Sequence, residues 1–109
     1  TPTGSTAYAL ASGGPILHPS LPAIALVPIC PQSLSNRPIV VTDTSMVELL
    51  LTKAHDVHAY YDNQYDCRLQ ERDRLMVRRF RNTLRILHPH NYHYYDTLRE
   101  KLRWGEQFV

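Results

Sequence analysis

The 109-residue sequence lacks any apolar run that could cross a bilayer. Its longest run, Ala23 to Ile29, is interrupted by Pro28, whereas a spanning helix needs about 20 residues. The sequence also has little excess charge of either sign, because the formal net charge is only +2 at pH 7. That balance requires neither a nucleic acid nor an anionic membrane. We therefore expect neither of them as a partner.

Cysteine is equally scarce, since only Cys30 and Cys67 occur. The 109 residues contain no secretory hydrophobic segment, so two reduced thiols in a cytoplasmic protein are the expected state. A Walker A sequence is missing too, which excludes a P-loop cradle for a triphosphate. The length suits one domain, or part of one, with a single core.

Strand-like segments fill most of the chain. Apolar runs bounded by prolines or polar loops predict about six strands, within residues 23–29, 38–43, 45–52, 56–69, 74–80 and 83–88. Segment 56–69 predicts a hairpin, because alternating residues flank Asp62-Asn63 and asparagine tolerates a positive φ.

Helices are expected only near the two ends. Ser5 or Thr6 can cap a short helix that runs to about Ser12, and Gly13-Gly14 can end it.

The last helix is expected from residue 92 to about residue 103, with Asn91 as its cap and Gly105 as its end. Strands joined by short turns favour antiparallel sheets packed in layers. The fold class expected is mainly β, or α+β overall, with a short helix near the start and one C-terminal helix.

The opening stretch TPTGSTAY, residues 1–8, predicts a ligand-binding turn. A glycine-containing turn that opens a helix exposes backbone N–H groups and favours negative charge. Hydroxyls of Thr3, Ser5 and Thr6 add donors, and Tyr8 offers a flat face for stacking. The combination suits a nucleotide, and an ordinary capped surface helix fits the same residues.

The longer stretch TPTGSTAYALASGGPI closely resembles the signature of bacterial NAD kinases. The resemblance continues through VPICPQSLSNRPIVV, similar to the family's proline-rich loop and following strand. Asp62 to Gln64 stands where the family usually has an Asp-Gly-Gln turn, and the end of the chain resembles the family's last two strands and closing helix. Essentially all 109 residues are covered.

This resemblance implies an enzyme that phosphorylates the 2′-hydroxyl of the adenosine ribose of NAD and produces NADP. ATP, with Mg²⁺ on its phosphates, or inorganic polyphosphate serves as donor in the family. The family's catalytic aspartate lies in a Gly-Gly-Asp-Gly motif of an N-terminal α/β domain, and this sequence has no such motif. Residues 1–109 are thus expected to be the C-terminal dinucleotide-binding portion, without a catalytic residue or a metal of its own.

The resemblance also implies partners and site residues. The expected partners are NAD or NADP, the N-terminal domain, and further copies in a homodimer or homotetramer. The residues that match the family's dinucleotide site are Thr6, Ala7, Tyr8, Ala9, Leu10, Ala11 and Gln64.

Two departures from the family bear on turns. Asn63 replaces the usual glycine, which a left-handed conformation can accept, and Glu71-Arg72 replaces a Pro-Gly turn, which predicts a looser or more polar connection.

Other hypotheses remain open at this point. The chain could be a stand-alone, non-catalytic nucleotide-binding module, and an upstream Gly-Gly-Asp-Gly segment would decide for the kinase. A lipid kinase relative is a third possibility that a phosphorylation assay would separate. The arginines of residues 72–85 favour a solvated face or a subunit contact over nucleic-acid recognition, and the histidines favour surface or packing roles.

Overall fold

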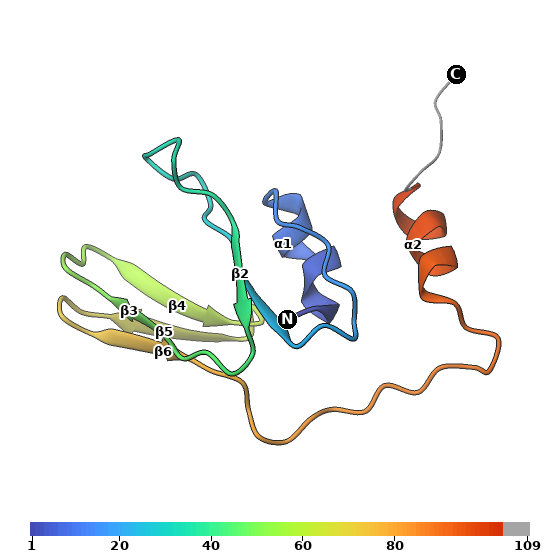
Figure 1. The fold of residues 1–109 in the computed structure, drawn as a ribbon. Helices are drawn as coiled ribbons and strands as arrows, with labels where there is room; N and C mark the ends of the chain where they lie inside the picture. The colour runs from blue at the N-terminus through green and yellow to red at the C-terminus, as the bar shows by residue number, and fades with distance from the viewer. Residues whose placement is uncertain (104–109) are drawn as a thin grey trace.

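The structure, a computed structural model, describes residues 1–103 and is mainly antiparallel β with helices near both ends (Figure 1). This confirms the expected fold class. In chain order the elements are the 3₁₀ helix η1 (Thr3–Thr6), α1 (Tyr8–Ala11), β1 (Ala23–Leu26), β2 (Ile39–Thr42), β3 (Val47–Leu50), β4 (Val57–Tyr61), β5 (Tyr65–Leu69), β6 (Arg74–Val77) and α2 (Tyr94–Leu102).

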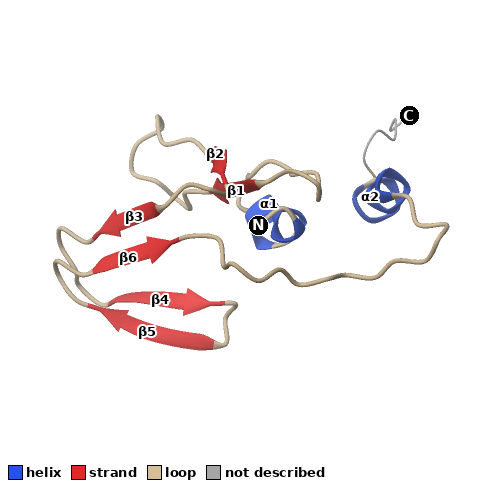
Figure 2. Cartoon of the chain, turned by 60° about the horizontal axis from the view of Figure 1, so that its bottom comes forward, coloured by secondary structure: helices blue, strands red, loops and turns tan. Residues whose placement is uncertain are grey.

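The six described strands pair into three antiparallel two-stranded sheets (Figure 2). β1 pairs with β2, with Leu26 opposite Ile39, and β4 pairs with its neighbour β5. β3 instead pairs with β6 across the intervening hairpin, with Leu49 opposite Leu75. The β3–β6 sheet therefore brings the segment after β2 beside the segment after β6.

The predicted hairpin is confirmed at its turn. Asp62 and Asn63 both have positive φ, 50° and 57°, and the Gln64 N–H donates to the Tyr61 carbonyl at 2.9 Å. These two consecutive left-handed residues turn the chain, and three residues, 62–64, lie between the paired Tyr61 and Tyr65. The Asp-Asn pair therefore fixes both the turn and the register.

One predicted strand is wrong. Residues 78–93, which we call the arm, run from β6 to α2 with no strand among them, and β6 ends at Val77 (Figure 1). Leu84 and Leu87 are 89% and 91% exposed. Segment 83–88 contains three apolar residues, Leu84, Ile86 and Leu87, but a strand exists only when a partner takes its backbone hydrogen bonds. Within residues 1–103 no partner strand pairs with it.

The last helix starts later than predicted. The Tyr92 N–H closes a turn by donating to the Pro89 carbonyl at 3.0 Å, and His93 is extended, so the Asn91 cap is wrong. The helix ends where Arg103 turns left-handed at φ 51°. The predicted stop at Gly105 lies outside the described residues.

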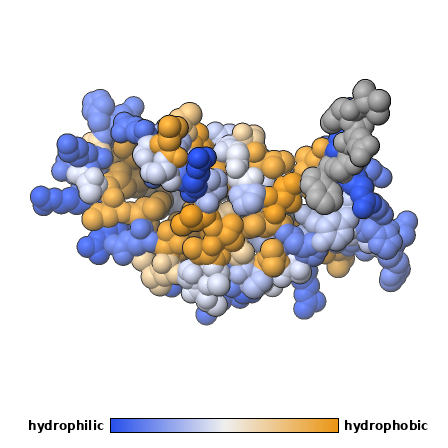
Figure 3. Space-filling view, turned by 45° about the horizontal axis from the view of Figure 1, so that its top comes forward, coloured by the Kyte–Doolittle hydropathy of each residue, from blue (hydrophilic) through white to orange (hydrophobic). Residues whose placement is uncertain are grey.

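The chain buries little of its apolar surface. Its accessible area is 9904 Å², against about 6,200 Å² for a compact monomer of this mass. The radius of gyration is 16.7 Å, against about 13 Å for a compact domain of this length. The buried hydrophobic residues are Leu17, Ala59 and Leu98, and hydrophobic side chains spread across the middle of the face in Figure 3. The described chain is therefore open rather than closed around one core.

Candidate functional site

Ser5 holds the opening turn in place. Its side chain is 1% exposed, and its Oγ donates to the Pro2 carbonyl at 2.6 Å and accepts the Leu17 N–H at 2.9 Å. Thr1 adds a bond from the Gly4 N–H to its Oγ1 at 3.1 Å. A buried hydroxyl that joins the Pro2 carbonyl to the buried Leu17 N–H fixes the turn against the segment that follows α1.

Neither predicted cap residue caps α1. Ser5 serves the contact with Leu17, and the Thr6 Oγ1 donates back to the Thr3 carbonyl at 3.4 Å. Both lie inside η1, and Ala7, at φ −106° and ψ −125°, separates η1 from α1 without a side-chain cap. The capping expectation is wrong because the first turn is a separate 3₁₀ helix.

The predicted end of this helix is confirmed. Gly13 takes a positive φ of 85°, which glycine adopts without strain. A Cβ on Gly14 would lie 2.8 Å from both the Ala9 carbonyl oxygen and Val27 Cγ2. Only glycine therefore permits the close approach between α1 and the chain that follows β1.

Of the seven predicted dinucleotide-site residues, six lie together on the ordered turn and α1. Thr6, Ala7 and Ala11 are exposed, and Ala9 and Leu10 are half-buried. Tyr8 is 69% exposed, so its ring and hydroxyl face solvent from a fixed backbone. The arrangement can offer an aromatic face and a phenol to a ligand.

Gln64 is exposed on the β4–β5 turn. This turn overlaps the N-terminal segment in the view of Figure 1. Figure 2 separates the two segments, and the arm runs between them in that view. Six of the predicted residues therefore lie from the end of η1 through α1, and the seventh, Gln64, lies on the β4–β5 turn.

The sequence did not lead us to expect a charged cluster along one face of the hairpin. The Nδ1 atom of His58 is hydrogen-bonded to Asp66 Oδ1 at 2.7 Å, and its Nε2 atom to Asp56 Oδ1 at 3.0 Å. The hydrogen bond to Asp56, then that to Asp66, raises the pKa of His58 above its ordinary 6.5. A protonated imidazole donates from both nitrogens, so the cluster links the start of β4 to β5 most strongly when His58 is charged.

The strand register of the hairpin explains why these side chains lie together. Tyr60 lies opposite Asp66 and His58 opposite Arg68, so His58 and Asp66 are diagonal neighbours, within reach of long side chains. Among residues 1–103, no three His, Cys, Asp or Glu side chains gather as they would around a metal ion. In the same part of the chain, no helix is long and apolar enough to span a bilayer.

Comparison with known proteins relates the whole chain to one family. The family model described as the ATP-NAD kinase C-terminal domain matches residues 1–88. NAD kinases of Chromobacterium violaceum and Laribacter hongkongensis are 65% and 62% identical over all 109 residues. The chain spans 38% of the length of these curated relatives.

A solved structure agrees with these matches. The crystal structure of yeast NADH kinase complexed with NADH superimposes with a TM-score of 0.82 at 29% identity, over 100% of this chain and 35% of the yeast chain. The family-model match and the yeast structure extend the sequence resemblance to the fold itself. This chain belongs to the ATP-NAD kinase C-terminal domain family.

Proposed function

We propose that this chain is the dinucleotide-binding portion of an NAD kinase. The proposed reaction transfers a phosphoryl group from ATP or polyphosphate to the 2′-hydroxyl of the adenosine ribose of NAD, giving NADP. One observation carries the proposal: proteins named NAD kinase are 62–65% identical over all 109 residues. The yeast neighbour, whose structure contains NADH, supports a dinucleotide as the ligand.

The turn and α1 would bind the dinucleotide. Tyr8 would stack on it or hydrogen-bond to a ribose or phosphate, and Thr6 with Ala7 would line the same site. Gln64 would approach from the hairpin turn. Phosphoryl transfer depends mainly on positioning and on charge stabilisation. The base and the groups that bind the donor phosphates would come from an N-terminal α/β domain, and Mg²⁺ would arrive with ATP.

Two partners follow from this proposal. The first is the rest of a longer protein, since the relatives are longer and the open shape of this chain is shared with part of the yeast structure. The second is another copy of the chain in a homodimer or homotetramer, because strand edges and apolar faces remain exposed. The expected compartment is the cytoplasm.

The test compares the full-length protein with residues 1–109 alone. Both are purified free of host NAD kinase and incubated with NAD and either ATP or polyphosphate, and NADP is measured with an NADP-specific dehydrogenase. We expect NADP from the full-length protein and none from residues 1–109, because one half of a site cannot position both substrates. No NADP from the full-length protein with either donor would refute the proposal. That result would favour a non-catalytic nucleotide-binding module.

A further inference from the structure

A hollow of about 570 Å³ lies where the β2–β3 loop meets the start of the arm. Its walls come from two short segments, residues 43–46 and residues 78–81. The pairing of β3 with β6 brings these segments together, although more than thirty residues separate them in sequence. These elements are different from those of the proposed dinucleotide turn.

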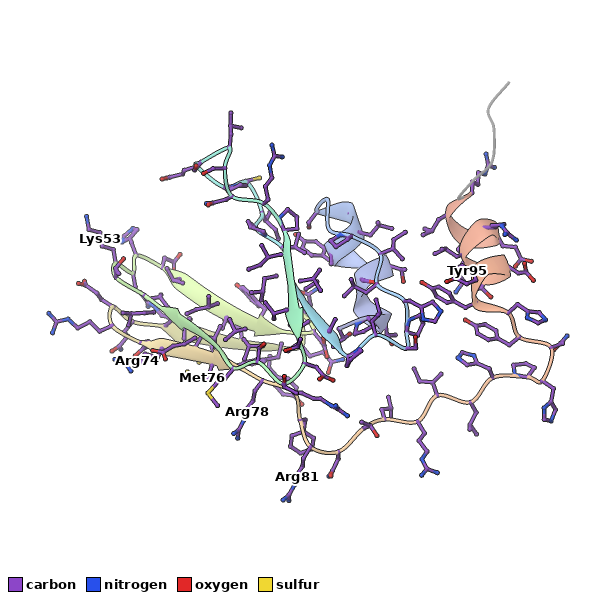
Figure 4. The ribbon with its side chains drawn as sticks, viewed as in Figure 1. Lys53, Arg74, Met76, Arg78, Arg81 and Tyr95 are labelled. Carbon is purple, nitrogen blue, oxygen red and sulfur yellow. The ribbon has the colours of Figure 1, made fainter. Side chains whose placement is uncertain are left out.

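The charges around this hollow are not balanced. Arg79 Nη1 donates to Asp43 Oδ2 at 2.9 Å, and this carboxylate is 15% exposed. Arg78 and Arg81 make no ion pair with any residue of the described chain. Three arginines against one aspartate leave a net charge of +2 on the walls. Figure 4 shows Arg78 and Arg81 projecting from the same side of the chain.

The opposite wall adds hydroxyl groups on a shaped loop. Thr44 Oγ1 lies 2.9 Å from Thr42 Oγ1, and Ser45 Oγ lies 3.1 Å from the same atom. The Ser45 N–H donates to the Thr42 carbonyl at 3.0 Å, which closes the turn. Hydroxyls rotate to donate or accept, so this wall can hydrogen-bond an oxyanion that the arginines attract.

We propose that this hollow is a second ligand site, which binds a diphosphate group. Two uncompensated guanidinium groups match the two or more negative charges of a diphosphate, and the planar fork of arginine suits phosphate oxygens. The ion pair of Arg79 with Asp43 holds the walls together rather than recruiting the anion. A net charge of only +2 is too small for the multiple phosphate contacts of nucleic-acid binding.

The experiment is titration calorimetry of inorganic pyrophosphate into the full-length protein at constant ionic strength. The variant Arg78→Ala/Arg81→Ala should bind at least about tenfold more weakly, because each lost guanidinium removes charge-assisted hydrogen bonds. Arg74→Ala is the matched control, because Arg74 begins β6, the strand that leads into the arm, but pairs with Glu48 at 3.4 Å. It should bind within about twofold of the parent. Melting temperatures show whether each variant is folded.

Two further titrations identify the source of the anion and the site that binds it. ADP in place of pyrophosphate should lose the same factor in the double variant, since the hollow recognises the shared diphosphate. Equal binding by parent and double variant, or an equal loss in Arg74→Ala, would overturn the inference. Loss confined to Tyr8→Ala would place pyrophosphate at the proposed dinucleotide turn, which overturns the second site and leaves the NAD kinase proposal intact.

Discussion

The β4–β5 hairpin and segment 83–88 of the arm were both expected to form strands, but only the hairpin does so. The hairpin forms because Asp62-Asn63 turns the chain so that Tyr65 meets Tyr61. The arm has no such turn, and none of residues 1–103 pairs with segment 83–88.

The difference shows that an apolar segment has only a tendency to form a strand, while a partner decides the outcome. An isolated strand leaves its backbone groups to water and gains nothing from its apolar face. The nearer the partner lies in sequence, the smaller the entropic cost of meeting it. Segments whose partners lie at different separations should therefore lose different amounts of stability when a contact is removed.

Segment 83–88 of the arm should be buried in the full-length protein. Replacing both Leu84 and Leu87 by aspartate should lower the free energy of unfolding by about 3–6 kcal/mol, because two leucines lose burial that is worth about 1.5–3 kcal/mol each. Chemical denaturation of the full-length protein measures the loss. Thr83→Asp, an exposed neighbour, is the control and should change stability by less than about 0.5 kcal/mol. Equal stability of the two variants would show that the arm remains uncovered.

The opening turn depends on a contact between residues 12 apart in sequence. Ser5→Ala should cost about 1–3 kcal/mol, because the Leu17 N–H and the Pro2 carbonyl lose a buried partner. Thr6→Ala removes a hydroxyl of the same kind at an exposed position and should cost less than about 0.5 kcal/mol. Thermal unfolding followed by circular dichroism compares the two. A Ser5→Ala protein as stable as Thr6→Ala would mean that the buried bonds do not hold this turn.

The hairpin turn can be tested at a single residue. Asn63 has φ 57°, so Asn63→Val should cost about 1–2 kcal/mol, the penalty for a side chain that resists the left-handed conformation. Asn63→Gly should be neutral or slightly stabilising, because glycine accepts this conformation freely. Urea denaturation of the pair gives both values. Equal losses in the two variants would show that the asparagine side chain, rather than its backbone conformation, determines the turn.

The smallest effect is expected at the surface cluster of His58. Its pKa is raised in the folded protein, first by Asp56 and then by Asp66. The stabilisation is therefore complete below the unfolded value of 6.5 and is lost as pH rises through the higher folded pKa. Titration by NMR should give a His58 pKa above 6.5 that falls in Asp66→Asn.

The stability measurement has its own control. His58→Gln should remove this pH dependence of unfolding, and His55→Gln should leave it unchanged. A His58 pKa at or below 6.5 in the parent would show that the cluster does not form in solution.

Local chemistry made much of the fold predictable. The hairpin, the glycine pair that ends α1 and the order of the elements follow from residues close together in sequence. The Glu71-Arg72 connection was expected to be looser or more polar than Pro-Gly, and it closes as an exposed turn in which the Asp73 N–H donates to the Gln70 carbonyl at 3.1 Å. Arg72 takes φ 73°, and the Gln70 N–H donates to Asp73 Oδ2 at 2.7 Å. Asp73, which lies outside the Glu71-Arg72 pair, supplies this hydrogen bond, so the pair alone did not predict it.

The rest depends on contacts over longer distances. The Ser5 bond to Leu17 and the pairing of β3 with β6 join separated segments, and no single motif contains them. The six neighbouring residues predicted for the dinucleotide site lie together because they are continuous in sequence, from the end of η1 through α1. Their contact with a dinucleotide is still a prediction. Their relation to Gln64 was not predictable, since it depends on how a separate hairpin lies. The prediction that Gln64 approaches the same ligand remains a prediction.

The central claim is that this chain binds the dinucleotide, and steady-state kinetics of Tyr8→Ala in the full-length protein tests it most directly. A stacked ring contributes about 1–3 kcal/mol, so the KM for NAD should rise by about one to two decades while the KM for ATP changes little. Gln64→Ala, which removes one neutral hydrogen-bonding side chain, should raise the KM for NAD by about one decade or less. Melting temperatures confirm that both variants are folded. A folded Tyr8→Ala protein with a raised KM for ATP and an unchanged KM for NAD would contradict the claim.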